Sequence, residues 1–299
     1  MYPHPIQQAS KATNIIYRFS LIFALVLWLT PLVAIFLTSM RSGDEVAKGE
    51  YWTKPENPLN FFSNISFVWN EGGSTSMAQY FANSLIIVIP SVFFALALAA
   101  TAGYALSKFR IRGGIWWFAM FVAGNFVPFQ ILMIPVKQMT QTLGLTTEVT
   151  LWGGMHFNLT VLALILFHIA FQTGFCTLFM RNFISGLPSE LIESARMDGM
   201  SEWVIFTRII LPLMRPALAA LAVLEFTFIW NDYFWAITFI QDSSWKPITA
   251  GIADLKGGWL AQWHLISVAS ILAALPPVIM FFFLQKHFVA GLTMGATKG

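Results

Sequence analysis

Six long apolar stretches dominate this chain and limit what it can fold into. They are residues 19–40, 80–107, 113–136, 150–180, 216–240 and 265–285. Each reaches the roughly 20 residues that a helix needs to cross the hydrocarbon core of a bilayer, and five of the six contain no Asp, Glu, Lys or Arg. Because lipid offers no hydrogen-bonding partner, the backbone of such stretches must bond to itself, and their near-continuous apolarity excludes the alternating strands of a barrel. We therefore predict an all-α membrane protein with six transmembrane helices.

The composition agrees with this prediction. Of the 299 residues, 57% are hydrophobic and only 10% are charged, against about 25% charged residues in a soluble protein. These values exclude a soluble enzyme, a nucleic-acid-binding domain and a disordered chain. The net charge of +3 is too small to indicate a polyanionic partner. The single cysteine, Cys176, permits no intrachain disulfide and no cysteine metal cluster, and we expect it to be a packed apolar side chain.

The basic residues indicate the orientation of the helices. We expect residues 19–40 to form an uncleaved first helix, because 22 apolar residues are too many for a signal peptide. With six spans both termini share one side, and that side carries eleven of the 17 Lys and Arg residues. Since cytoplasmic loops carry the basic excess, we predict a multi-pass protein of the inner (cytoplasmic) membrane with residues 1–18 and 286–299 in the cytoplasm. Residues 41–79 would then form a periplasmic loop, and residues 80–285 a five-helix core.

The fourth stretch, 150–180, is too long for one straight helix across the bilayer. Glycines stand near both of its ends. We expect a bend, or a segment outside the lipid, near Gly153 and Gly154 or near Gly174.

The segment between the fourth and fifth stretches, residues 181–212, is more polar than the rest and carries signals for helix ends. In order these are Pro188, Glu190, Glu193, Gly199, Ser201 and Pro212. Proline suits a first helical position, acidic residues favour the positive end of a helix, and glycine adopts the left-handed conformation that closes one. Serine then caps a second helix and proline limits it. We predict two short helices joined by a tight turn outside the bilayer.

The spacing within this segment resembles the EAA loop of binding-protein-dependent ABC importers. The matching residues are Glu193-Ser194-Ala195, then Gly199 after three residues, then Ile209-x-Leu211-Pro212 after nine more. The family has alanine where this chain has Ser194, which is also small. The chain is most similar to the shorter permease subunit of the maltose-type carbohydrate-uptake importers. Further resemblance lies in Trp230-Asn231-Asp232 with Phe234, in Pro128-Phe129-Gln130, and in the tail from Gly291 to Gly299.

The resemblance implies a function and a set of partners. In that family the EAA loop docks in a cleft of a cytoplasmic ATPase subunit and transmits its closure to the transmembrane helices. The implied assembly has this chain, a second permease subunit as heterodimer partner, two ATPase subunits and a periplasmic or extracellular sugar-binding protein, and it carries a sugar across the lipid bilayer by alternating access. ATP and Mg would bind the ATPase subunits, and this chain, which has no phosphate-binding loop motif, would bind no cofactor and be no enzyme. The implied ATPase-coupling residues are Glu190, Glu193, Ala195, Arg196, Asp198, Gly199, Leu211 and Pro212.

Glu225 and Asp232 are the only acidic residues within the predicted spans. An ionisable side chain in a membrane is costly and therefore points to function, although each is also compatible with a structural hydrogen bond between helices. Seven residues apart, they would share nearly one helix face. Amides and carboxylates bond to sugar hydroxyls, and aromatic rings stack on a pyranose. The candidate substrate-binding residues are Trp230, Asn231, Asp232, Tyr233, Glu225, Asn125 and Gln130.

Several alternatives stay open. The companion permease could make most of the substrate contacts while this subunit only closes the cavity. The chain could instead be a secondary transporter that uses Asp232 or Glu225 for ion coupling, or a structural membrane subunit of an enzyme complex. We expect His156 and His168 to be structural, and no catalytic or metal site is predicted, because no set of residues has the required spacing.

Overall fold

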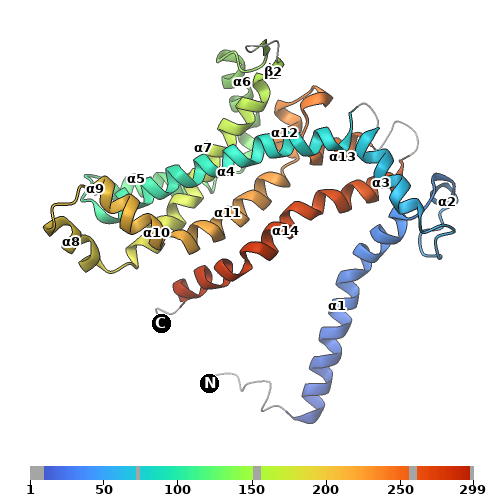
Figure 1. Cartoon of the computed structure of the whole chain (residues 1–299), viewed down its shortest axis with the longest axis horizontal. Coiled ribbons are helices and arrows are strands. Elements are labelled where there is room, and N and C mark those ends of the chain that lie inside the picture. Colours follow the sequence, from blue (N-terminus) through green and yellow to red (C-terminus); the bar gives the residue numbers. More distant parts are fainter. Residues whose placement is uncertain (1–9, 72–74, 151–155, 256–260, 297–299) are drawn as a thin grey trace. The chain divides into compact units, whose positions relative to one another are not determined.

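The computed structural model describes residues 10–71, 75–150, 156–255 and 261–296, with side chains to residue 285. Two compact units make up the chain. The first contains residues 1–73 and 254–272, and the second contains residues 74–253 and 273–299. Figure 1 follows the chain from end to end.

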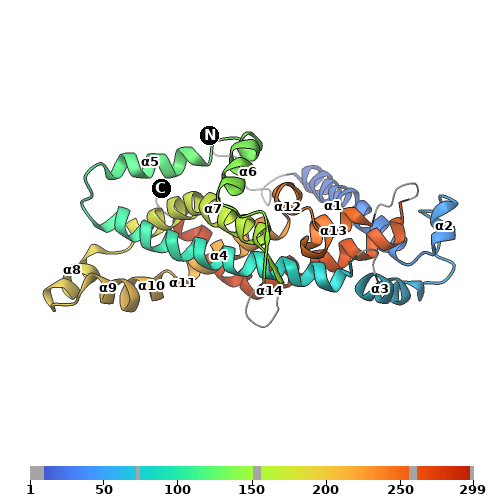
Figure 2. The same cartoon turned by 90° about the horizontal axis from the view of Figure 1, so that it is seen from above.

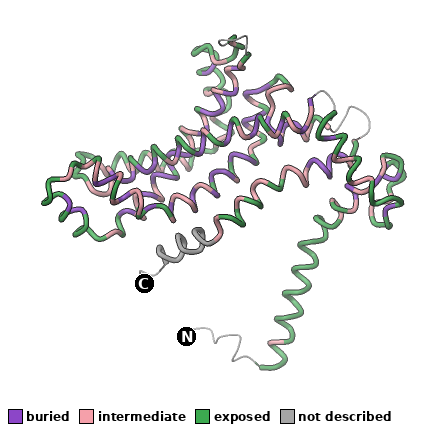
Figure 3. Tube along the Cα trace, viewed as in Figure 1, coloured by how far each residue is buried: buried purple, intermediate pink, exposed green. Residues whose placement is uncertain are grey.

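In the first unit a long helix leads into a short polar segment. The helix α1 (Lys11–Ser39) starts at Ser10, whose hydroxyl accepts a hydrogen bond from the amide of Thr13. Its surface is exposed along most of its length (Figure 3), as expected of a helix whose apolar side chains face lipid. Two further helices follow, α2 (Gly43–Ala47) and α3 (Asn60–Asn70). The predicted loop 41–79 is therefore partly helical.

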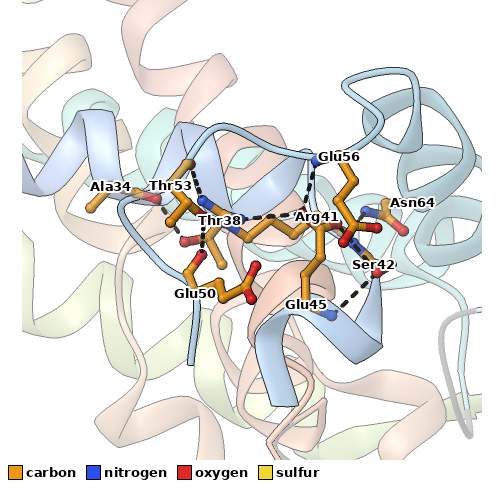
Figure 4. A network of polar contacts seen from close by, with 9 residues as sticks. All are labelled: Ala34, Thr38, Arg41, Ser42, Glu45, Glu50, Thr53, Glu56 and Asn64. Carbon is orange, nitrogen blue, oxygen red and sulfur yellow. Dashed lines mark hydrogen bonds and ion pairs between the residues drawn. The ribbon is translucent and has the colours of Figure 1, made fainter. Parts of the chain in front are cut away.

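A buried arginine organises this segment (Figure 4). Arg41 is fully buried and donates to the side chain of Glu45, to the hydroxyl of Thr53 and to the backbone carbonyl of Thr53. Glu45 also accepts from the amides of Ser42 and Glu56. Burial raises the pKa of Glu45, but these hydrogen bonds and the Arg41 charge outweigh burial and leave the pKa below its ordinary value. The Glu45 carboxylate and both terminal nitrogens of Arg41 are thus hydrogen-bonded, as a buried ion pair requires, whereas the Arg41 Nε has no partner among the described residues.

The second unit begins with the elements that carry the second to fourth apolar stretches. They are α4 (Met77–Lys108), α5 (Gly114–Gly124), a 3-10 helix (Phe129–Leu132), α6 (Met133–Thr142), the antiparallel pair β1 (Glu148–Thr150) and β2 (His156–Asn158), and α7 (Leu159–Ser185). Helices α4 and α7 form the most extensive contact of the chain and run side by side (Figures 1 and 2). They approach closely at Gly103, where an added Cβ would lie 2.8 Å from Cβ of Met180. Small residues permit such contacts between membrane helices.

The remaining elements complete the second unit. They are α8 (Ser189–Met197), α9 (Glu202–Ile205), a π-helical turn (Phe206–Ile210), α10 (Leu211–Leu213), α11 (Arg215–Trp230), α12 (Phe234–Phe239), a 3-10 turn (Ser243–Trp245), α13 (Ile248–Asp254) and α14 (Trp263–Ala296), which begins in the first unit and continues here. Helix α11 packs on both α4 and α7.

The predicted helical membrane fold is confirmed, with corrections to individual spans. Among the described residues four helices are long and apolar enough to cross a bilayer, and two bent helix pairs raise the number to as many as six. The third predicted span is not one helix: α5 and the segment Phe129–Thr142 meet at 91°, because Pro128 lacks an amide hydrogen and restricts the residue before it. In the fifth predicted span, 216–240, the first helix ends at Trp230 and does not continue through the stretch.

The fourth predicted span starts later than expected. Residues 150–158 belong to the β pair, where described, and α7 begins at Leu159. Gly153 and Gly154, expected to mark a bend, lie outside the described residues. Helix α7 runs without a break through Gly174, the other position considered for a bend. An added Cβ at Gly174 would lie 2.8 Å from the backbone oxygen of Phe121, so this glycine permits close contact between α5 and α7.

Candidate functional site

The predicted pair of short helices is present between α7 and α11, and we name residues 188–212 the coupling hairpin. Gly199 has a φ of +78°, the left-handed conformation predicted for it. Pro188 is the residue before the first turn of α8 instead of its first residue. Ser201 occupies the position before α9, but its hydroxyl accepts no capping hydrogen bond. Both views of the fold place α8 to α10 near the end of α4, with α8 furthest out (Figures 1 and 2).

The coupling hairpin has one apolar face and one polar face. Ile192, Ala195, Ile205 and Phe206 are buried in a cluster with residues of α4, α7 and α11. Of the predicted coupling residues, Ala195 is buried, Leu211 and Pro212 are partly buried, and the exposed ones are Glu190, Glu193, Arg196, Asp198 and Gly199. The polar groups thus form an exposed surface on a packed base, which suits contact with another protein.

An ion pair closes the turn of the coupling hairpin. The guanidinium Nε of Arg196 donates to Oε1 of Glu202 over 2.6 Å. This hydrogen bond raises the pKa of Arg196, so the pair remains ionised. The other carboxylate oxygen, Oε2, accepts a 2.8 Å hydrogen bond from the hydroxyl of Tyr104 on α4. Sequence analysis assigned Arg196 to polar contact but missed both Glu202 and Tyr104.

The end of the coupling hairpin continues into a spanning helix. The π-helical turn Phe206–Ile210 and α10 follow α9 without a gap, and the segment Glu202–Leu213 meets α11 at 71°. Ile210 and Met214 are fully buried on either side of this connection. The hairpin is therefore joined to α11 by a connection with packed side chains on both sides.

A cavity of about 650 Å³ lies beside α7, α11 and α12. Aromatic rings dominate its lining, among them Phe129, Phe167, Phe171, Phe228, Tyr233, Phe234, Trp235 and Phe281. Its polar lining groups are His168, Thr227, Asn231 and Asp232, and none of the described lining residues is Lys or Arg. Flat apolar walls with a few polar groups are typical of small-molecule sites.

His168 and Asp232 meet in this cavity. The Nε2 atom of His168 lies 3.5 Å from Oδ2 of Asp232, and the histidine is buried. Asp232 also accepts hydrogen bonds from the amides of Trp235 and Ala236, both at 3.2 Å, and thereby caps α12. Sequence analysis expected His168 to be structural and had no signal for its partner, which lies 64 residues further along the chain.

The other predicted substrate residues divide into two groups. Asn231 and Tyr233 line the cavity with Asp232, although the Asn231 amide donates to the carbonyl of Thr227. Trp230 and Glu225 do not line it. Trp230 is buried, donates to the carbonyl of Ala273 and stacks on Phe226, and Glu225 is buried with Cys176, whose thiol lies 3.2 Å from its carboxylate.

The expectation that Glu225 and Asp232 share one helix face was wrong. Helix α11 ends at Trp230, so Asp232 stands in the connection that leads to α12. The helical spacing therefore does not relate the two side chains. As expected for Cys176, its side chain is buried.

Asn125 and Gln130 lie at the break of the third span. Asn125 ends α5, donates to the carbonyl of Phe121 and lines a second cavity of about 510 Å³ between α5, α6 and α7. Gln130 is exposed and lines neither cavity. Phe167 and Phe171 line both cavities and separate them. Across the described ranges, no three His, Cys, Asp or Glu side chains are grouped so that they could hold a metal ion.

Comparison with known proteins shows that the sequence of this chain matches a known family. Residues 65–294 match the model of the family described as binding-protein-dependent transport system inner membrane component. The chain is 31% identical over 277 residues to the osmoprotective compounds uptake permease protein of Synechocystis sp., which covers 91% of this chain and 88% of that protein. It is 30% identical over 269 residues to the arabinooligosaccharides transport system permease protein of Halalkalibacterium halodurans, which covers 90% and 91%.

A solved structure supports the fold. The crystal structure of a bacterial ABC transporter involved in the import of the acidic polysaccharide alginate contains a chain that is similar with a TM-score of 0.75. The match covers 94% of this chain and 99% of that one at 24% sequence identity. At this identity the likeness concerns the arrangement of the helices.

Proposed function

This chain belongs to the binding-protein-dependent transport system inner membrane component family, and from that premise we propose that it is a permease subunit of an ABC importer for sugars. A separate ATPase drives it between inward-open and outward-open forms. The ATPase binds and hydrolyses ATP with Mg, and this chain supplies the surface that it moves.

The coupling hairpin is the observation that supports this proposal. It presents exposed polar side chains on a packed base, and it continues into α7 at one end and α11 at the other. A compact helix pair carries a displacement, whereas a flexible loop absorbs it. Contacts that differ between two states of the ATPase can therefore bias the helices between two states.

The aromatic cavity supports a neutral sugar as the substrate. The relative from Halalkalibacterium halodurans is named for arabinooligosaccharides, and aromatic rings suit the apolar faces of sugar rings. Asp232 and Asn231 supply polar groups that bond to hydroxyls. Because no described lining residue is Lys or Arg and Asp232 is an acid, an acidic sugar would face the Asp232 carboxylate without either of these cations to offset it.

The remaining parts of the assembly follow from the same proposal. They are a second permease that completes the pathway, two ATPase subunits on the cytoplasmic side, and a sugar-binding protein on the other side. The excess of basic residues on the side of the termini supports an orientation with both termini in the cytoplasm. The coupling hairpin then faces the cytoplasm.

Two glycines permit a controlled test. Gly199 and Gly49 have φ values of +78° and +77°, and an added Cβ meets nothing within 4 Å at either. Alanine at either position therefore carries a similar backbone strain of about 1 kcal/mol, but only Gly199 lies in the coupling hairpin. In vesicles that contain the complete transporter, Gly199→Ala should reduce ATP-dependent sugar uptake severalfold, and Gly49→Ala should leave it near the wild-type rate.

Two results would contradict the proposal. Equal uptake by the two variants would show that the hairpin turn does not carry the coupling. Sugar uptake by this chain alone, in vesicles without nucleotide, would favour an ion-coupled secondary transporter instead.

A further inference from the structure

The last turn of α4 holds the coupling hairpin at two separate points. The hydroxyl of Tyr104 donates to Oε2 of Glu202, the first residue of α9, over 2.8 Å. The ammonium of Lys108 donates to the backbone carbonyl of Leu187, just before α8, over 3.2 Å. Tyr104 and Lys108 are four residues apart, so they lie on one face of α4. Helix α4 is thereby bonded to the first residue of α9 and to Leu187, the residue that immediately precedes the coupling hairpin.

Glu202 joins these contacts across the turn. Arg196 and Glu202 stand three residues before and three residues after Gly199, and the left-handed turn brings their side chains together. Their side chains are 39% and 41% exposed, so the ion pair by itself contributes little to stability. The effect of the ion pair is to hold the Glu202 carboxylate where Oε2 accepts the hydrogen bond from the hydroxyl of Tyr104.

The surroundings of Tyr104 are densely packed. The residue is only 4% exposed, and its ring lies 5.3 Å from that of Phe206 in the hairpin and 5.5 Å from that of Phe109. Its neighbour Gly103 lies at a close contact of α4 with α7. Apolar packing resists separation but is not directional, whereas the two hydrogen bonds also fix the position of the hairpin along α4.

We propose that Tyr104 and Lys108 are positioning residues that make α4 move together with the coupling hairpin. The chain itself connects the hairpin to α7 and α11, and these two bonds add α4 as a third spanning helix. The proposal rests on the proposed function, because it requires a motor that displaces the hairpin. Without the two bonds, the hairpin slides against α4 and part of each displacement is lost before it reaches the membrane.

Uptake and ATP hydrolysis measured on the same vesicles test this proposal. Tyr104→Phe removes only the hydroxyl, and Lys108→Met keeps most of the side-chain length. Matched controls are Tyr17→Phe and Lys48→Met, since both residues are exposed and lie in the first unit. In the double variant we expect the sugar transported per ATP hydrolysed to fall at least about fivefold, because the loss of one hydrogen bond corresponds to a factor of about five and this variant removes two. ATP hydrolysis and the amount of assembled complex should stay near those of the double control.

A distance measurement separates positioning from general stabilisation. Spin labels at Met197→Cys on α8 and Leu98→Cys on α4 occupy exposed positions, and the native Cys176 is fully buried. With the two bonds intact, the distance between the labels should be the same with and without ATP. With Tyr104→Phe and Lys108→Met present, it should change on ATP binding.

Specific outcomes overturn the inference. The inference is overturned if the double variant transports as much sugar per ATP hydrolysed as the double control. It is also overturned if the distance between the labels changes with ATP while both bonds are intact. Failure of the wild-type complex to take up sugar with ATP is a different result, because it would overturn the proposed function and with it this proposal.

Discussion

The contact between α4 and α7 at Gly103 permits a quantitative prediction for Gly103→Ala. The new Cβ would lie 2.8 Å from Cβ of Met180 and 3.0 Å from the backbone nitrogen of Arg181. Neither atom can rotate away, so one helix must shift, and overpacking of this kind costs about 1–3 kcal/mol. Alanine recovers about 0.5–1 kcal/mol because it favours the helix more than glycine does. We therefore expect a net loss of about 1 kcal/mol, within bounds of roughly 0 and 2.5 kcal/mol.

Gly124→Ala is the matched control, since Gly124 is also helical and an added Cβ there meets nothing within 4 Å. The assay is the fraction of purified complex that remains monodisperse in detergent after heating. The apparent midpoint should fall for Gly103→Ala and stay level or rise for Gly124→Ala. If Gly103→Ala proves as heat-resistant as Gly124→Ala, the close packing of α4 on α7 is wrong.

Two further predictions concern charged groups. The pKa of Glu45 is lowered from its ordinary value of 4.5, so its ionised form stabilises the fold above about pH 4.5, and this contribution is lost as the pH falls through the lower pKa of the folded state. Hydrogen exchange around Arg41 and Thr53, corrected for its intrinsic rate, should therefore accelerate on acidification in the wild type. The Glu45→Gln variant should show no such pH dependence. Asp232→Ala should destabilise α12 by about 1 kcal/mol through loss of its cap and also reduce sugar uptake. Asp232→Asn keeps an oxygen that can accept one of the two capping hydrogen bonds, so a normal uptake rate in both variants would remove Asp232 from the substrate site.

The sequence was sufficient to predict the helical membrane fold and the coupling hairpin, for different physical reasons. Spanning helices follow from the apolarity of whole stretches, and this signal does not depend on which residue stands at any one position. The hairpin is dictated by local signals, above all by Gly199, whose left-handed conformation few other residues adopt. Both kinds of information lie within short segments of the chain.

The breaks between helices and the contacts of the site could not be predicted in this way. The stretch 216–240 is apolar throughout apart from two acids, and hydropathy gives no sign that the helix ends at Trp230 before Asp232. The bond between Tyr104 and Glu202 joins residues 98 positions apart, and the 3.5 Å approach of His168 to Asp232 depends on how α7 lies against the connection between α11 and α12. Such pairs are set by packing between helices, which has no periodic signal in one sequence.

The partition between the two cavities is built from the rings of Phe167 and Phe171, whose planes are stacked 16° from parallel. Opening a passage between the cavities requires rotation of these two side chains about their own bonds, while the main-chain hydrogen bonds of α7 stay intact. The size of the side chains at positions 167 and 171 therefore sets the width of any passage between the two cavities.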